Sequence, residues 1–280
     1  PMSEEFPLMR VHMVPGLLEV AQRNISRGAK DFAIFEMGSI FRGVQKPVPM
    51  ISPALGQKPN PKEIASIYAS LPPQAFHVAG LLVGKIENED WQGKTRSYTW
   101  QDAIAFAQEI LDLCNLEYSI KRSDFAPWHP GRCAALSING ELIGHAGELA
   151  PRALENLGLP KRAVALELNL SAVLNAANVV ASAPAIWTFP VAKEDIALVV
   201  KADVAAIEVL NVVRVAAGDL LEDIRLFDVY EGSQVAEGHK SLAFALRFRA
   251  QDRTLAAEEV AAARQAGVDA AAKSFGATLR

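Results

Sequence analysis

The order of expected elements in residues 187–280 constrains the fold more than any other feature of this sequence. Runs of branched and aromatic residues predict strands, and apolar residues at helical spacing predict helices. In chain order the elements are a strand at 194–200, a helix at 204–217 capped by Asp203, strands at 224–231 and 240–250, a helix at 257–275 and a strand at 276–280. This βαββαβ order is typical of a ferredoxin-like fold, in which two helices cover one face of a four-stranded antiparallel sheet.

The uncovered face of that sheet carries side chains that suit a flat, polar ligand. Successive strand residues point to opposite faces, so Asp228 and Tyr230 lie on the face opposite to Phe227 and Val229. In the neighbouring strand the same alternation places on this open face Ser241, Ala243, Ala245, Arg247 and Arg249. An aromatic ring, a carboxylate, a hydroxyl and arginines around a floor of alanines predict a platform on which a nucleic-acid base stacks and is read at its edge.

The charge of this part of the chain keeps an alternative open. Residues 187–280 contain 11 Lys and Arg against 14 Asp and Glu, a net charge of -3, which does not favour binding of a polyanion. The open face is alternatively an interface that another protein domain covers.

Residues 1–183 predict a separate module of mixed α and β structure. Helices are expected at 14–25, near 64–71, after Thr99 and at 151–157, and strands at 31–41, which we interpret as buried, 76–85, 118–122, 132–138, 141–149 and 164–170. The turn Asn139-Gly140 is the strongest hairpin signal, because these residues supply the two positive φ angles of a type I′ turn. Such hairpins favour an antiparallel sheet. A run of small residues from Asn175 to Ala185 is the expected linker, so the expected domains are 1–183 and 187–280.

Composition excludes several classes of protein. The chain is 50% hydrophobic with a net charge of -4, so it has a substantial core and no general attraction to nucleic acid. Cys114 and Cys133 fit neither a disulfide framework nor a zinc site and favour a reducing compartment. No apolar run reaches the length of a membrane span, and the first residues lack the pattern of a signal peptide, so the chain looks like part of a longer protein.

The remaining polar motifs predict local structure more than chemistry. The five histidines lack the spacing of a metal site and are expected to be solvated or locally hydrogen-bonded; they are His12, His77, His129, His145 and His239. The segment from Trp128 to Arg132 predicts a tight structural turn before a strand. The alternative interpretation is that this turn lines a pocket. No metal site and no catalytic arrangement is predicted from spacing.

Several segments together resemble one family. Those from Leu226 to Gly232, Glu237 to Arg249 and Asp252 to Val260 resemble the C-terminal anticodon-binding domain of bacterial phenylalanine-tRNA ligase β subunits. The resemblance continues through 24–38, 128–132, 144–149, 189–190 and 195–200, so it covers essentially the whole chain and the last third of such a subunit.

The resemblance implies a fold and an absence of catalysis in this chain. It implies an α+β architecture: a class II synthetase-like antiparallel sheet with helices in 1–183, then the ferredoxin-like βαββαβ domain in 187–280. The Phe35-Glu36 strand lacks the arginine two positions before the glutamate that class II enzymes use, and no glycine-rich segment ending in arginine follows. We therefore expect a non-catalytic module that supports the catalytic α subunit.

The resemblance also implies which residues bind tRNA. The positions that match the family's anticodon contacts are Asp228, Tyr230, Ser241 and Arg280, and Arg247 on the open face is added to them. Tyr230 offers a stacking surface, Asp228 can accept from the N1 and N2 donors of a guanine, and Arg280 can hold a phosphate or stack.

The implied assembly is a cytoplasmic ligase of two α and two β subunits that charges tRNA(Phe) with phenylalanine. ATP and Mg²⁺ belong to the whole enzyme. This fragment is expected to bind no cofactor and no metal, and not to associate with a membrane. Three alternatives stay open: a purely structural module whose open face is a protein interface, an ATP site in 1–183, and small-ligand sensing by the ferredoxin-like unit.

Overall fold

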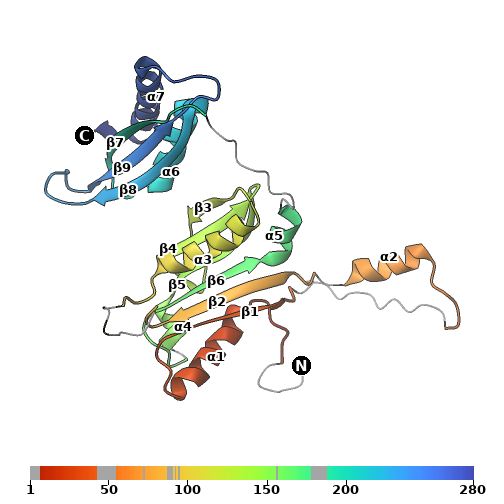
Figure 1. Ribbon diagram of the computed structural model, residues 1–280. Coiled ribbons are helices and arrows are strands. Elements are labelled where there is room, and N and C mark those ends of the chain that lie inside the picture. The colour runs from red at the N-terminus through yellow and green to blue at the C-terminus, as the bar shows by residue number, and fades with distance from the viewer. Residues whose placement is uncertain are drawn as a thin grey trace. The chain divides into compact units, whose positions relative to one another are not determined.

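The computed structural model describes residues 7–42, 55–71, 73–86, 91, 93, 95–155, 157–177 and 188–280. The chain forms two compact units, 1–182 and 183–280, and each is described by itself (Figure 1). Most of the expected linker, Asn175 to Ala185, falls within residues 178–187, which lie outside the described part.

The first unit is built on a six-stranded sheet in which all neighbouring strands are antiparallel. Across the sheet the strands follow the order β1-β2-β6-β5-β4-β3. The strands are β1 (Phe32–Ser39), β2 (Phe76–Val83), β3 (Ser119–Arg122), β4 (Trp128–Ile138), β5 (Glu141–Leu149) and β6 (Ala163–Asn169). The helices are α1 (Val14–Ser26), α2 (Pro61–Ser70), α3 (Trp100–Leu113), α4 (Pro151–Glu155) and α5 (Leu170–Ala176).

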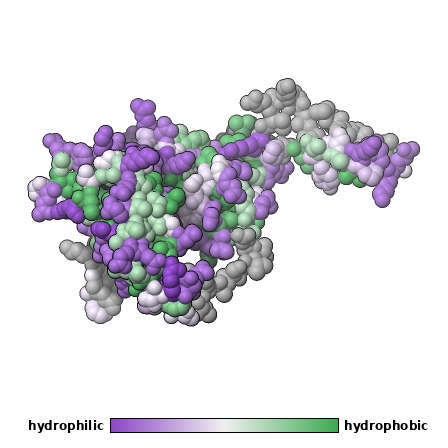
Figure 2. Space-filling view, turned by 90° about the horizontal axis from the view of Figure 1, so that it is seen from above, coloured by the Kyte–Doolittle hydropathy of each residue, from purple (hydrophilic) through white to green (hydrophobic). Residues whose placement is uncertain are grey.

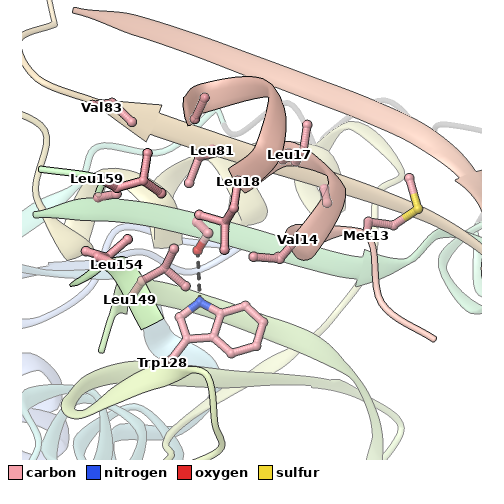
Figure 3. Close-up of a cluster of buried hydrophobic side chains, with 14 of the residues drawn as sticks. Met13, Val14, Leu17, Leu18, Leu81, Val83, Trp128, Leu149, Leu154 and Leu159 are labelled. Atoms are coloured by element: carbon pink, nitrogen blue, oxygen red, sulfur yellow. Dashed lines mark hydrogen bonds between the residues drawn. The ribbon is translucent and has the colours of Figure 1, made fainter. Parts of the chain in front are cut away.

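Helices cover both faces of this sheet. On one face α1 and α4 pack on Ala79, Leu81 and Val83 of β2, and on the other α3 and α5 pack on Val78 and Leu82. The alternation of β2 residues between the two clusters follows from the two-residue repeat of a strand. Figure 3 shows Trp128 under α1, where its indole Nε1 donates to the Ala165 carbonyl oxygen at 3.2 Å.

Two expectations for this unit were wrong. The strand interpreted as buried, β1, lies at the edge of the sheet, and its Phe35 and Met37 side chains are 73% and 54% exposed. The segment from Trp128 to Arg132 is the first part of β4 rather than a turn, and Arg132 reaches Glu148 of β5, with Nη1 2.7 Å from Oε1. Sequence periodicity is local, so it detects a strand but not the strand's neighbours.

The hairpin prediction was confirmed. Asn139 and Gly140 have φ angles of 50° and 82°, and Ile138 pairs with Glu141 across the turn. β4 and β5 therefore meet through a two-residue loop with the twist that antiparallel strands require.

The second unit confirms the ferredoxin-like order. Its elements are β7 (Ala192–Lys201), α6 (Ala206–Ala217), the 3₁₀ turn η1 (Gly218–Leu220), β8 (Leu221–Tyr230), β9 (His239–Phe248), α7 (Ala257–Phe275) and β10 (Thr278–Leu279). The sheet order is β10-β7-β9-β8, and α6 and α7 pack on one face over Leu242, Phe244, Leu246 and Phe248. No helix among residues 188–280 covers the opposite face. Asp203 is not the cap of α6, which begins after Ala205 without a side-chain cap.

On the face seen in Figure 2, hydrophilic side chains alternate with apolar patches. α2 stands away from the sheet, and none of its described side chains is buried (Figure 1). Among the described helices, none is long and apolar enough to cross a membrane.

Candidate nucleic-acid interface

The open face of the second sheet is set by the register of β8 on β9. Asp228 pairs with Ala243 and Tyr230 with Ser241, so these four residues share the face away from the helices. The register shifts between Leu226 and Asp228, which is a β-bulge at Phe227. Leu226 pairs with Phe244, which faces the helices, so Leu226 faces the helices as well. Without the bulge, the two-residue repeat would place Leu226 on the same open face as Asp228.

Tyr230 and Arg280 meet across the sheet. Tyr230 ends β8 at one edge, and Arg280 follows β10 at the other edge, where its backbone N–H donates to the Ala197 oxygen at 2.9 Å. The Arg280 guanidinium carbon lies 5.3 Å from the centroid of the Tyr230 ring, and Gln234, in the loop between β8 and β9, accepts a hydrogen bond from Arg280. This is a cation–π contact that occupies one face of the phenol.

Ser241 lies beneath this contact. It sits on the central strand β9, in register with Tyr230 of β8 and Val199 of β7. Ser241 is only 4% exposed.

Asp228 is exposed and adjacent to this cluster. It lies two residues before Tyr230 on the same face, about 7 Å along the strand. Half-buried Ala197, Ala243 and Ala245 form the floor beside it. Asp228, Tyr230, Ser241 and Arg280 therefore lie together at one end of the open face.

Arg247 is not part of that cluster. It lies six residues after Ser241 on the same strand, which is about 20 Å. There a shallow cavity of about 320 Å³ is lined by Lys193, Asp195, Asp223, Arg225, Ala245, Leu246 and Arg247. The open face thus has an aromatic end and, at the other end, a basic cluster, defined here as Lys193, Arg225 and Arg247. Two carboxylates, Asp195 and Asp223, lie beside this cluster.

Arg249 was expected on the open strand face, and the structure places it just beyond the end of β9. β9 ends at Phe248, and the Arg249 side chain is 15% exposed, with Nε 3.6 Å from Oε2 of Glu222. Arg247 Nε lies 3.5 Å from the same oxygen. A register shift between Leu221 and Asp223 places Glu222 in a second bulge, which brings one carboxylate close to both arginines.

Three further side chains belong to the interface that the sequence did not single out. Gln234 holds Arg280, and Lys193 and Arg225 join Arg247 in the basic cluster. Alternation from Ala197 could have placed Lys193 on this face. Arg225 faces outward only because of the bulge at Phe227, which alternation from Asp228 does not reveal. Gln234 is a loop residue without any periodic signal.

The arrangement suits recognition of a single-stranded base flanked by phosphates. An aromatic ring supplies a stacking surface, a carboxylate accepts from base amino groups, and guanidinium groups bind phosphates. Within the residues the structure describes, no group of three His, Cys, Asp or Glu side chains is arranged to hold a metal ion.

Comparison with known proteins assigns both units. A family model for the phenylalanyl tRNA synthetase beta chain CLM domain matches residues 1–170, and a model for the ferredoxin-fold anticodon binding domain matches residues 188–280. The phenylalanine–tRNA ligase beta subunits of Streptomyces avermitilis and Thermobifida fusca are each 46% identical, over 284 and 287 residues. That of Cutibacterium acnes is 43% identical over 280 residues.

These matches cover 100% of this chain but only 33–34% of each relative. The chain therefore spans about a third of the length of the curated relatives it matches. The family resemblance expected from the sequence is confirmed, since one family model covers more than half of the chain. The chain belongs to the phenylalanyl-tRNA synthetase β-chain family.

Proposed function

We propose that this chain binds the anticodon of tRNA(Phe) on the open face of its second unit, as part of a phenylalanine-tRNA ligase. The observation that carries the proposal is the contact of Arg280 with Tyr230, in which a flat cation already occupies the position that a base would take. The match of residues 188–280 to the anticodon-binding family supports the same surface.

Binding begins with exchange at Tyr230. A base stacks on the phenol and displaces the Arg280 guanidinium, which then turns to a backbone phosphate. The Ser241 hydroxyl can bond a base or ribose. Asp228, exposed at the next outward position, accepts from the N1 and N2 donors of a guanine.

The basic cluster serves a different purpose. Lys193, Arg225 and Arg247 lie about 20 Å from Tyr230 and contact phosphates farther along the RNA. Such contacts add affinity for RNA of any sequence. The carboxylates of Asp195 and Asp223 lie beside them and reduce this added affinity, because they repel phosphate.

Fluorescence anisotropy of a labelled tRNA(Phe) anticodon stem-loop tests this proposal. Tyr230→Ala should weaken binding by about 5- to 150-fold, the range for loss of one stacked base. Tyr68→Ala removes an exposed tyrosine of α2 in the other unit and serves as the matched control, with unchanged affinity. Tyr230→Phe keeps the ring and should retain most of the affinity.

Two further variants separate base reading from charge. Asp228→Asn should reduce discrimination against a stem-loop whose first anticodon base is changed. Arg247→Ala should weaken both stem-loops equally and reduce the salt dependence of binding. If neither Tyr230→Ala nor the changed base affects binding, the open face does not read the anticodon. In that case a protein interface on this face, tested by loss of subunit pairing in Tyr230→Ala, becomes the better explanation.

We also propose that the first unit supports the α subunit of the ligase. An apolar groove of about 400 Å³ runs between edge strand β1, strand β2 and helix α3, and exposed Phe35, Met37, Phe106 and Leu113 line it. Exposed apolar grooves of this kind mark protein interfaces. The outer side of β1 also has no pairing strand among the described residues.

Co-purification with the α subunit tests the groove. Phe35→Arg should abolish or strongly weaken pairing, whereas Leu174→Arg, at an exposed apolar position of α5, should not. Equal pairing of both variants would exclude the groove as the interface. In the whole cytoplasmic enzyme, proposed to contain two α and two β subunits, ATP and Mg²⁺ would act at sites outside this chain.

A further inference from the structure

The loop between β8 and β9 meets the aromatic end of the open face at one glycine. The far end of the Tyr230 side chain lies against Gly232, two residues later in the chain. A Cβ atom placed on Gly232 would stand 2.5 Å from Oη of Tyr230, 2.7 Å from Cζ and 3.2 Å from Cε1. Carbon atoms that are not bonded pack at about 3.5 to 4.0 Å. The phenol therefore occupies the space that a side chain at position 232 would need.

This steric contact, and not the backbone, is what requires a glycine here. Gly232 is not among the glycines with a positive φ, so the left-handed region that favours glycine is not the reason for it. The residue is exposed, and the atoms that a Cβ would meet belong to the end of a flexible side chain. A methyl group at this position is thus compatible with the fold, but not with the present place of the phenol.

The turn that begins at Gly232 also holds the cation on the ring. The Gly232 carbonyl oxygen accepts from the Val235 N–H at 3.0 Å, which closes a tight turn with Gln234 as its third residue. Gln234 accepts a hydrogen bond from the Arg280 guanidinium, which lies over the Tyr230 ring. One turn therefore contacts both the phenol and its cation.

Both sides of this arrangement are tied to strand β7. At the end of the loop, the Gly238 carbonyl oxygen accepts from the N–H of Ala202, the residue after β7, at 2.8 Å. The backbone N–H of Arg280 donates to Ala197 of the same strand. A tyrosine side chain has several staggered rotamers, and contacts on two sides restrict Tyr230 to one of them.

We propose that Gly232 is a positioning residue for the stacking of a base on Tyr230. This role rests on the proposed binding of an anticodon to the open face. A ring that is already held in one orientation loses little conformational freedom when a base stacks on it, which favours binding. In Gly232→Ala the added methyl group turns the phenol away from Arg280, and RNA then has to order the ring again.

NMR of the free whole chain tests the placement of the ring without RNA. The wild type should show nuclear Overhauser contacts from the Tyr230 ring to the Hα protons of Gly232 and to the Arg280 side chain. Gly232→Ala should lose the contact with Arg280 but unfold in urea at a midpoint close to that of the wild type, because no buried group is changed. An Arg280 contact that persists in Gly232→Ala would overturn the proposal.

Anisotropy with the anticodon stem-loop tests the consequence for binding. Gly232→Ala should weaken binding by at least about threefold and by no more than Tyr230→Ala does. In the Tyr230→Ala background the same substitution should have no further effect, because the phenol that the methyl group would meet is gone. Ser233→Ala, at the next exposed position of the turn, is the matched control and should keep the wild-type affinity.

The outcomes separate the role of Gly232 from anticodon binding itself. Wild-type affinity of Gly232→Ala, together with weakened binding of Tyr230→Ala, would overturn the positioning role and leave anticodon binding intact. Equal losses from Gly232→Ala in both backgrounds would indicate a general disturbance of the loop and would also overturn it. Wild-type affinity of Tyr230→Ala would overturn the proposed function, and the role of Gly232 with it.

Discussion

Replacing Glu167 with Gln tests how strongly one buried carboxylate holds α1 on the first sheet. Glu167 is 4% exposed and accepts from the first backbone N–H groups of the helix and from His77. Gln keeps the size of the side chain but removes its charge and one of its two acceptor oxygens.

The magnitude follows from the pKa of Glu167. Burial by itself raises this pKa, but the contacts with His12, His77 and the amides of Met13 and Val14 outweigh burial and lower it from 4.5 to about 2. Each tenfold change in a protonation equilibrium corresponds to about 1.4 kcal/mol, so the ionised carboxylate contributes about 3 kcal/mol to the free energy of unfolding. Because the folded-state pKa is lowered, this contribution is complete above about pH 4.5 and is lost as the pH falls toward 2.

We therefore expect Glu167→Gln to destabilise the first unit by about 3 kcal/mol at neutral pH and by progressively less below about pH 4.5. Urea unfolding followed through the Trp128 indole NMR signal, at pH 7 and at about pH 3, measures both values. Glu117→Gln, at an exposed position before β3, should change stability by less than about 0.5 kcal/mol. A Glu167→Gln variant as stable as the wild type at pH 7, or equally destabilised at both pH values, would refute this reasoning.

Two further predictions concern single residues of the first unit. Burial raises the pKa of Cys133 to about 11, so at pH 8 this thiol should react with iodoacetamide far more slowly than half-buried Cys114. Peptide mass spectrometry after timed labelling measures the two rates. Equal rates would contradict the argument from burial. Gly140 has a φ of 82°, so Gly140→Ala should lower the free energy of unfolding by about 1 to 2 kcal/mol, whereas Asn139→Gly should be nearly neutral. Urea unfolding measures both changes. An unchanged stability of Gly140→Ala would contradict the argument from backbone strain.

Local patterns identified most of the secondary structure. The spacing of apolar residues located α1 and α7 almost to the residue, and the Asn139-Gly140 pair located the β4–β5 turn. These features depend on residues that are close in the sequence. The short helix α5 was missed, because it continues directly from β6 and its Asn169 cap lies within the strand's own run.

Errors arose where a residue's environment depends on distant segments. The apolar run of β1 suggested burial, but the strand is at the edge of the sheet and exposes Phe35. Asp203 has the chemistry of a cap, yet α6 begins three residues later. Trp128 was placed in a turn, although its pairing with Leu149 makes it part of β4.

The candidate interface was predicted in part. Alternation correctly placed Asp228, Tyr230 and Ser241 on one face, since this needs only the two-residue repeat of a strand. It could not show that Arg280 reaches Tyr230 from the opposite edge of the sheet, or that Ser241 is buried. Their roles in RNA binding stay predictions.

The sequence by itself therefore determined the element order and ferredoxin-like topology of the second unit, the outward positions of Asp228, Tyr230 and Ser241, and the family. Only the tertiary structure brought Arg280 onto the Tyr230 ring and assembled His12, His77 and His145 around Glu167. The physical reason is the range of the interactions. Turn chemistry and periodicity act over a few residues, whereas the contact of His77 with Glu167 joins neighbouring strands of the sheet at positions 90 residues apart in the chain.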